Sequence, residues 1–388
     1  MLFTALSYGK MTRRFPVAGS AYTYSQQSFG GHAGFLTGWA LMLDYLLLPL
    51  INYLLLGLYL GAYFPAFPGA LWVVLAIAVV TVLNVLGIKS VSSFNGIVVV
   101  VQVVFAAVFI VLSITTATGQ GVPDVATAFT GSNGLPALFT GAAILCLSFL
   151  GFDAVSTLSE EARNPLRDVP RAIMAVTFIG GLTFIVLSFM SYLVIPDWIT
   201  FENVDTASAE VVQAAGGAWL SNFFIACLAA GATGSALASQ ALVSRILYTM
   251  GRDGVLPRPL FGVLNRRFGS PARATLVVSA VSLLALVLPL ETVISVISFG
   301  ALAAFTMVNL SVVKSYAMDD GRRRGGDAVR FVVLPLIGFC LTVWLWTSLP
   351  GNAVVVGIIW VALGVLYLAV LTRGFRRQPP TLDMKEVA

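Results

Sequence analysis

Long apolar stretches separated by short polar segments recur along almost the whole chain. A run of about 20 apolar residues crosses the bilayer hydrocarbon as a helix, whereas a membrane barrel needs alternating apolar and polar positions. Because the runs are continuous, the pattern predicts an all-α polytopic membrane protein with one domain over residues 1–388. Ten full transmembrane helices are expected, at residues 34–64, 70–88, 96–116, 135–159, 172–195, 218–249, 274–290, 291–316, 329–349 and 352–373.

The two ends of the chain differ from these spans. Residues 1–8 are apolar, but a helix of this length covers only about 12 Å and does not cross a membrane. They have neither the basic start nor the cleavage site of a signal peptide. We interpret them as the end of a longer helix whose beginning is absent, a half-helix before the first span. Residues 374–388 are expected to form a cytoplasmic tail.

Basic residues occur only in alternate loops, and these loops hold all 22 Lys and Arg residues. Segments 117–134 and 196–217 hold none and carry Asp and Glu instead. The positive-inside rule therefore places both termini in the cytoplasm. The chain is expected to lie in the plasma (inner) membrane. The basic residues lie at 10–14, at Lys89, and within 163–171, 245–273, 314–330 and 373–385.

Composition excludes several classes of protein. The chain is 58% hydrophobic and 10% charged, far from the quarter that is usual in soluble domains. The net charge of +5 does not indicate nucleic-acid binding, because the basic residues lie in short loops. Cys146, Cys227 and Cys340 each lie within an apolar run and are expected to be free thiols, and His32 is the sole histidine. We expect no metal, no cofactor and no enzymatic activity, since no catalytic motif is present.

One carboxylate stands inside an apolar run, in the segment ILCLSFLGFDAVSTLSEEARNP. Asp153 lies two residues after Gly151, and the segment then reaches the water-exposed Glu160 and Glu161. Intramembrane carboxylates mark functional sites, and irregular backbone at membrane depth lines cavities. Residues 149–156 are thus expected to be a broken helix at a substrate site; the alternative is an unbroken helix with one buried, paired aspartate.

A second carboxylate, Asp44, lies in the first span beside Tyr45. It is either a second binding group or a structural residue bonded to a serine or amide of another helix. Ser235 and Ser239 in the sixth span either line a path or coordinate an ion, or they serve only for close helix packing.

Four stretches in the same order resemble the amino acid–polyamine–organocation superfamily of permeases, and together they extend over nearly the whole chain. They are LFTALSYGKMTRRFPVAGSAYTY, GWALMLDY, SFLGFDAVSTLSEEARNPLRDVPRAI and SRILYTMGRDGVLP. Three further segments are most similar to the bacterial putrescine importers of that superfamily. They are LDYLLLPLIN, FNGIVVVVQVV and LETVISVISFGALAAFTMVNLSV.

The resemblance implies an inverted-repeat, LeuT-like transporter fold in which two broken helices face each other at the midplane. It also implies that the first helix of the family and most of the second are missing here. Many members carry a lysine at the position of Gln102, so that residue does not supply the coupling charge. Similarity to putrescine importers implies proton coupling, with Asp44, Asp153 or Glu291 as the carrier.

The expected function is therefore secondary active import of a cationic amine, putrescine or another polyamine, by proton symport. Besides Asp153, Asp44 and Gly151, the rings of Phe149, Phe152 and Tyr45 are expected to bind the substrate. The expected partners are a small-molecule substrate, protons and the lipid bilayer. One alternative is a general amino acid permease of the same fold. Another is a truncated remnant that does not transport, or a membrane sensor.

Overall fold

The structure is a computed structural model that describes residues 1–16, 20–87, 91–130, 134–159 and 162–380. Every regular element in these ranges is helical, which confirms the all-α prediction. Lys89, Glu160 and Glu161, singled out in the sequence, lie outside the described residues.

The elements follow one another along the chain in two halves. The first half consists of α1 (Leu2–Arg14), α2 (Ser20–Phe29), α3 (Gly31–Tyr63), α4 (Gly69–Leu86), α5 (Val91–Gln120), α6 (Thr127–Thr130), α7 (Gly134–Ile144), η1 (Leu145–Phe149), η2 (Ala154–Leu158) and α8 (Pro165–Val194). The second half consists of η3 (Trp198–Thr200), η4 (Val204–Thr206), α9 (Ala207–Arg252), α10 (Arg258–Phe261), α11 (Ala272–Ser282), η5 (Leu283–Leu286), α12 (Leu290–Val312), η6 (Val313–Asp319), α13 (Gly326–Ala328), η7 (Val329–Val333), α14 (Leu334–Thr347) and α15 (Gly351–Leu371).

Within the described residues, 8 helices are long and apolar enough to cross a membrane, so the chain is a multi-pass membrane protein. Two of the ten predicted spans take other forms. The span at 274–290 corresponds to the shorter apolar helix Ala272–Leu286. The span at 135–159 is divided, because its α-helical part ends at Ile144.

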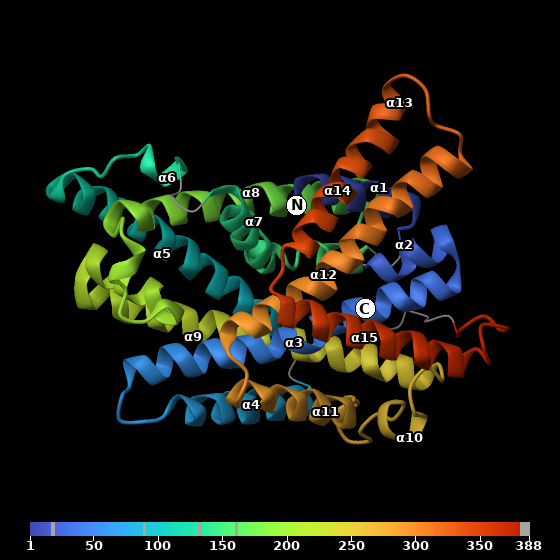
Figure 1. The fold of residues 1–388 in the computed structure, drawn as a ribbon. Helices are drawn as coiled ribbons and strands as arrows, with labels where there is room; N and C mark the ends of the chain where they lie inside the picture. The colour runs from blue at the N-terminus through green and yellow to red at the C-terminus, as the bar shows by residue number, and fades with distance from the viewer. Residues whose placement is uncertain (17–19, 88–90, 131–133, 160–161, 381–388) are drawn as a thin grey trace.

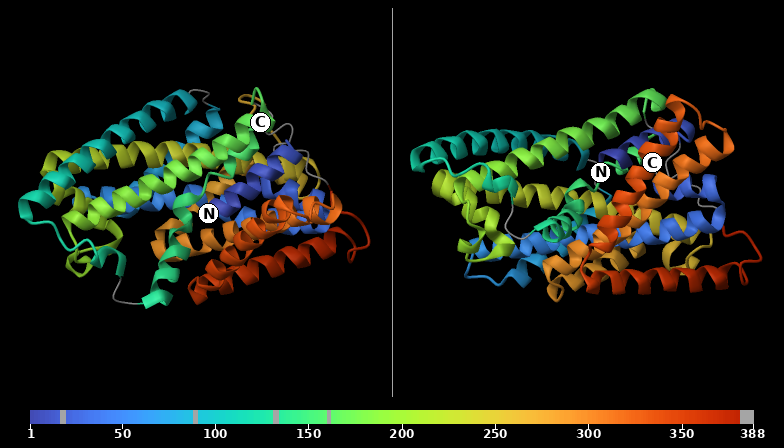
Figure 2. Two further views of the ribbon diagram at one scale, coloured as in Figure 1. Left: turned by 90° about the horizontal axis from the view of Figure 1, so that it is seen from above. Right: turned by 45° about the horizontal axis from the view of Figure 1, so that its top comes forward.

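Two helices form the centre of the bundle. In the most apolar window of each helix, 78% of the residues are buried in α3 and 72% in α12, but only 11% in α8. Figure 1 shows α3 running through the molecule, and it packs against α12, α9, α2, α4 and α15. Figure 2 shows α5 and α8 side by side along one flank and α15 along the opposite flank. Among the membrane-length helices, α3 and α12 are therefore the most shielded from the surroundings.

Helix α3 is fixed to α15 by two tryptophans that bond to each other's backbone. Trp39 Nε1 donates to the Trp360 carbonyl at 2.9 Å, and Trp360 Nε1 donates to the Trp39 carbonyl at 2.8 Å. The two rings stack with centroids 5.0 Å apart. Each indole N–H is thus satisfied inside the protein, as a membrane environment requires.

Helix α9 contains a break that agrees with the predicted span at 218–249. Gly217 has φ 69° and ψ −165°, a conformation that glycine adopts readily but that interrupts a helix. The residues before Gly217 include Glu210, and the apolar part follows it. The predicted start of the span at residue 218 thus coincides with this break.

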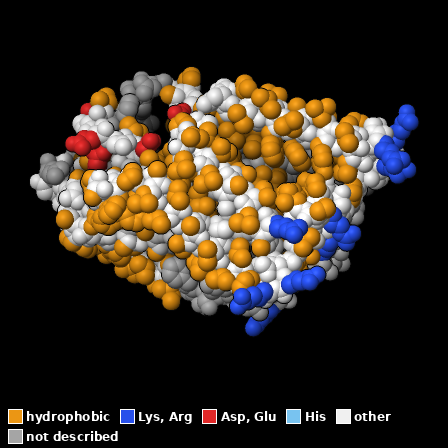
Figure 3. Space-filling model, turned by 90° about the horizontal axis from the view of Figure 1, so that it is seen from below, with side chains coloured by type: hydrophobic (Ala, Val, Ile, Leu, Met, Phe, Trp, Pro, Cys, Tyr) orange, Lys and Arg blue, Asp and Glu red, His pale blue; other side chains and the backbone are white. Residues whose placement is uncertain are grey.

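Charged side chains are separated between two ends of the molecule. On the face shown in Figure 3, Asp and Glu gather at one end, while Lys and Arg gather at the opposite end.

The predicted half-helix at residues 1–8 belongs to α1, which ends at Arg13 and Arg14. Helix α1 packs against α8, α12 and α14.

Candidate functional site

The break after α7 is built around Asp153. Gly151 has φ +109°, a left-handed conformation that turns the chain out of the helix. Its backbone N–H donates to Asp153 Oδ1 at 3.2 Å. The Ser156 hydroxyl donates back to the Asp153 carbonyl at 2.6 Å, a local bond that competes with α-helical pairing. The predicted break is confirmed, although α-helical geometry ends at Ile144, earlier than the 149–156 expected from the sequence.

Helix α3 brings two adjacent polar residues to this break. The Tyr45 hydroxyl donates to Asp153 Oδ2 at 3.4 Å, and Asp44 lies next to Tyr45 in the same helix. Asp44 is 1% exposed and Asp153 is 2% exposed. The two carboxylates are close enough to interact electrostatically. The structure therefore brings together the two aspartates that the sequence singled out.

Helix α12 closes the other side of Asp44 because Gly300 allows the two helices to touch. A Cβ at Gly300 would lie 2.7 Å from the Ala40 carbonyl oxygen and 3.1 Å from the Asp44 nitrogen. The 2.7 Å distance to a backbone atom is shorter than a Cβ atom tolerates and the second is tight, so only glycine fits here without a shift of α3 or α12. The close approach keeps the Asp44 region out of lipid.

Four aromatic rings, from α1, α2, α12 and the break itself, pack against one another beside Asp153. The Tyr8 ring meets the rings of Tyr24, Phe152 and Phe305 edge to face, with centroids 5.9, 5.5 and 5.9 Å away. Phe152 and Phe305 are 5.1 Å apart. Tyr8 interacts electrostatically with both Asp153 and Asp44. The ring cluster therefore adjoins the acidic site, and the faces of aromatic rings attract cations.

The acidic site has no basic partner in the described part of the chain. The only buried basic side chain there is Lys10, whose Nζ donates to the Arg330 carbonyl oxygen. Asp44 Oδ1 is buried and accepts no hydrogen bond from a described residue. The Tyr8 and Tyr24 hydroxyls lie next to Ser20 and Ser156 but outside hydrogen-bonding geometry. The site thus combines two acidic side chains that have no cationic partner among the described residues with unused polar atoms.

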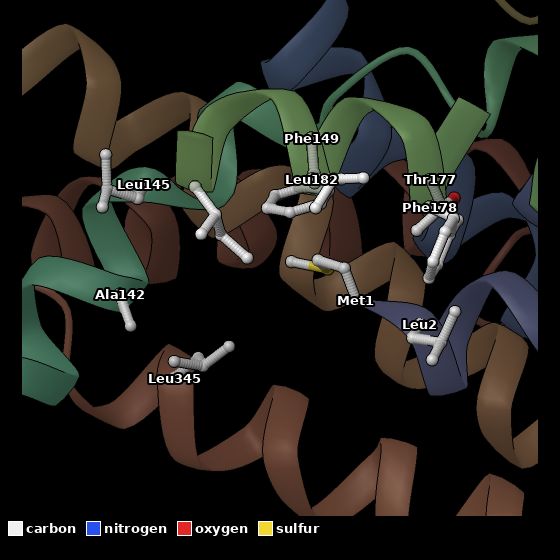
Figure 4. A pocket seen from close by; sticks show the side chains of 11 residues that line it. Met1, Leu2, Ala142, Leu145, Phe149, Thr177, Phe178, Leu182 and Leu345 are labelled. Atoms are coloured by element: carbon white, nitrogen blue, oxygen red, sulfur yellow. The ribbon is translucent and has the colours of Figure 1, made fainter. Parts of the chain in front are cut away.

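Phe149 lies away from this site. Its ring packs against Phe184 of α8 at 5.6 Å and lies over Gly181. It lines an apolar cavity of about 480 Å³ bounded by α1, α7, α8 and α14, which Figure 4 shows from close by. Because Thr177 is the main polar side chain of this cavity, it offers no acidic partner to an amine.

The residues predicted for coupling are also separate from the two aspartates. Gln102 of α5 lies against Gly231 of α9, where its Nε2 would be 2.2 Å from an added Cβ. Ser239 donates to the Ser235 carbonyl of its own helix at 2.8 Å, and Ser235 is exposed. Glu291 is exposed in the first turn of α12.

Sequence reasoning missed four residues of the site: Tyr8, Tyr24, Phe305 and Gly300. Aromatic residues and glycine are common in apolar spans, so their local sequences carried no signal. The one clue was that α1 and α2 hold three tyrosines among small polar residues.

A bundle of membrane-length helices around a helix break and buried carboxylates is the architecture of secondary transporters. The fold is similar to that of MhsT, solved in complex with L-phenylalanine, with a TM-score of 0.60 over 89% of this chain and 88% of that chain. At 15% sequence identity, this similarity defines the LeuT-like fold alone.

The sequence model of the amino acid permease family matches residues 1–372, and the chain belongs to this family. It is 39% identical over 388 residues to the low-affinity putrescine importer PlaP of Escherichia coli (strain K12), covering 99% of this chain and 86% of that protein. It is 27% identical over 394 residues to the branched-chain amino acid permease BcaP of Bacillus subtilis (strain 168), covering 96% of this chain and 83% of that one. The chain is thus a transporter of this type and not an enzyme.

Proposed function

We propose that this chain imports a cationic amine, putrescine or a related polyamine, in symport with protons. The observation that carries the proposal is the pair of buried carboxylates, Asp44 and Asp153, without a basic partner among the described residues. Buried charges need compensation, and a substrate with two ammonium groups provides it. The similarity to the putrescine importer PlaP supports the same substrate class.

The site contains a group for each end of a diamine. Asp153 is held by Gly151 and Tyr45, so its position is fixed. Asp44 Oδ1 has no partner in the described chain and is free to bind the second ammonium. The rings of Tyr8, Phe152 and Phe305 add cation–π attraction, about 2 kcal/mol for a desolvated cation.

Proton coupling follows from the same pair of groups. Two carboxylates that interact in a low-dielectric interior repel each other when both are charged. A proton on one of them reduces this repulsion and crosses together with the bound amine, while the protonated carboxyl still accepts a hydrogen bond from an ammonium through its carbonyl oxygen. Glu291 is a less direct proton carrier because it is exposed at the start of α12.

We also propose the orientation of the chain. The basic end of the molecule, with α1, α10 and the loop after α12, faces the cytoplasm, and the acidic end with α6 faces outside. Anionic lipid and the positive-inside rule favour this arrangement.

A general amino acid permease is the second candidate, favoured by the family match and by the similarity to BcaP. An amino acid brings its own carboxylate, which in this fold binds to free backbone N–H groups at broken helices. At the break described here, the N–H of Gly151 is already bonded to Asp153. This geometry favours an amine without a carboxylate.

Uptake of radiolabelled putrescine by proteoliposomes containing the purified protein tests the proposal. An inward proton gradient should stimulate uptake, and unlabelled polyamines should compete better than branched-chain amino acids. Asp153→Asn should abolish uptake, while Asp153→Glu should keep a fraction of it. Asp168→Asn, at an exposed position in the first turn of α8, is the matched control and should leave uptake unchanged. Competition by amino acids alone would favour the second candidate.

A further inference from the structure

Two segments of π-helix face each other at the basic end of the molecule. They are η6 and η7, and they flank the loop between α12 and α14. Figure 1 shows this hairpin with α13 at its tip and α1 beside it. π-Helix is rare and occurs mostly at functional sites. Here each π-segment contributes one ring to a stack, Tyr316 from η6 and Phe331 from η7, with centroids 4.5 Å apart and planes within 7°.

Four cationic groups surround this ring pair. Arg14 Cζ lies 5.0 Å from the centroid of Tyr316, and Arg322 Cζ lies 5.8 Å from Tyr316 and 5.6 Å from Phe331. Arg330 Cζ and Lys10 Nζ lie 5.3 and 5.8 Å from the centroid of Phe331. We call these four residues, with the two rings, the basic cluster. The ring faces hold the guanidinium groups in place without neutralising them.

The acidic residues nearby leave most of this charge uncompensated. Asp320 binds Arg14 through two bonds of 2.5 and 3.0 Å, and this contact lowers the pKa of Asp320. Asp319 is paired with Lys314. Among the described residues, neither Asp319 nor Asp320 forms an ion pair with Arg322 or Arg330. Both of these arginines are exposed, so their charge is available to an anion from outside the chain.

An apolar surface continues directly from the basic cluster. Met318, Val329 and Val333, in or beside the same π-segments, are 57%, 54% and 45% exposed. Leu336 and Ile337 continue this exposed face along α14. A soluble anion gains no binding energy from an apolar surface, whereas the acyl chains of a lipid pack against it.

We propose that the basic cluster binds the phosphate headgroup of an anionic phospholipid in the leaflet at this end of the molecule. Arg322 and Arg330 bind the phosphate directly, because a guanidinium offers paired donors that match phosphate oxygens. Lys10 adds charge from α1, where Arg14 is already paired with Asp320, and the acyl chains lie against Val329 and Val333. The bound lipid would join α1 to the α12–α14 hairpin. This inference is independent of the transported substrate.

The test is binding of phosphatidylglycerol to the purified protein in neutral detergent, measured by native mass spectrometry. The double variant Arg322→Gln/Arg330→Gln should bind phosphatidylglycerol about thirtyfold more weakly, since each basic residue near an anionic lipid surface contributes about 1 kcal/mol to binding. The matched control is Arg266→Gln/Arg267→Gln, which removes the same charge from two adjacent exposed arginines after α10. The control should change the affinity less than twofold. Arg322→Lys/Arg330→Lys keeps the charge and should restore part of the binding, which separates charge loss from misfolding.

Three outcomes would overturn the proposal. The first is an equal loss in the site and control variants, which would mean unspecific attraction. The second is equal binding of phosphatidylcholine, which would mean that no anionic headgroup is recognised. The third is binding of soluble glycerol 1-phosphate as strongly as phosphatidylglycerol, which would identify a soluble phosphate ligand instead of a lipid.

Discussion

The Tyr45 hydroxyl donates to Asp153 Oδ2 at 3.4 Å across a sequence separation of 108 residues. This bond joins the central helix α3 to the break between η1 and η2. Tyr45 follows Asp44 directly, so one short piece of α3 supplies both a second carboxylate and the group that orients the first. A movement of the break relative to α3 would therefore change the Tyr45–Asp153 bond and the position of Asp153 relative to Asp44 at the same time.

Replacing Tyr45 by phenylalanine removes this bond and keeps the ring. Hydrogen bonds to a charged group contribute about 1.5–3 kcal/mol, and the length of this one favours the lower end. We expect Tyr45→Phe to raise the KM for putrescine roughly tenfold, measured by initial uptake rates. Tyr53→Phe is the matched control, because Tyr53 is buried in the same helix and its hydroxyl has no partner among described residues. Equal effects in the two variants would show that the bond to Asp153 has no role in binding.

Asp44→Asn distinguishes a second binding group from a structural aspartate. If Asp44 binds one end of a diamine, the variant should weaken the binding of putrescine more than the binding of butylamine, which has one ammonium group. We expect the inhibition constant for putrescine to rise at least about tenfold, since a charged hydrogen bond is lost, and that for butylamine to change little. The measurement is competition against labelled substrate with both amines. Equal weakening of both amines contradicts the paired-carboxylate site.

Gly300→Ala tests whether the close contact of α3 and α12 maintains the site. The added Cβ would lie 2.7 Å from the Ala40 carbonyl oxygen, so α12 must move away from Asp44. Overpacking of this kind destabilises a protein by about 1–3 kcal/mol. We expect a lower melting temperature in detergent and a marked loss of uptake. Gly119→Ala in α5 is the control, because nothing lies within 4 Å of the added methyl group. Normal uptake by Gly300→Ala would show that this contact is unimportant for transport.

Cysteine labelling tests the proposed orientation. In a background without the native cysteines, Thr127→Cys and Asn203→Cys should react with an impermeant maleimide added to whole cells. Val263→Cys, exposed in the loop after α10, should react only after the cells are permeabilised. The expectation rests on the confinement of all 22 Lys and Arg residues to alternate loops. Labelling of Val263→Cys in intact cells would invert the arrangement.

The sequence by itself determined the helical membrane class, most of the spans and the two acidic residues of the candidate site. Each of these features is local. A span is recognised by its own hydropathy, and Asp44 and Asp153 differ sharply from the apolar residues around them. Gly151 was also recognisable, because a glycine two residues before a carboxylate predicts a break, and the structure contains that break.

The tertiary structure alone decided which other residues face the two aspartates. Phe149 and Phe152 are three residues apart in similar surroundings, yet the turn at Gly151 directs Phe149 to α8 and Phe152 to Tyr8. Tyr8, Phe305 and Gly300 are ordinary residues of apolar helices and become part of the site through the packing of α1 and α12 against α3. Hydropathy indicates whether a residue is buried away from water, but it does not indicate which residues it then contacts. That choice depends on helix packing between segments far apart in the chain.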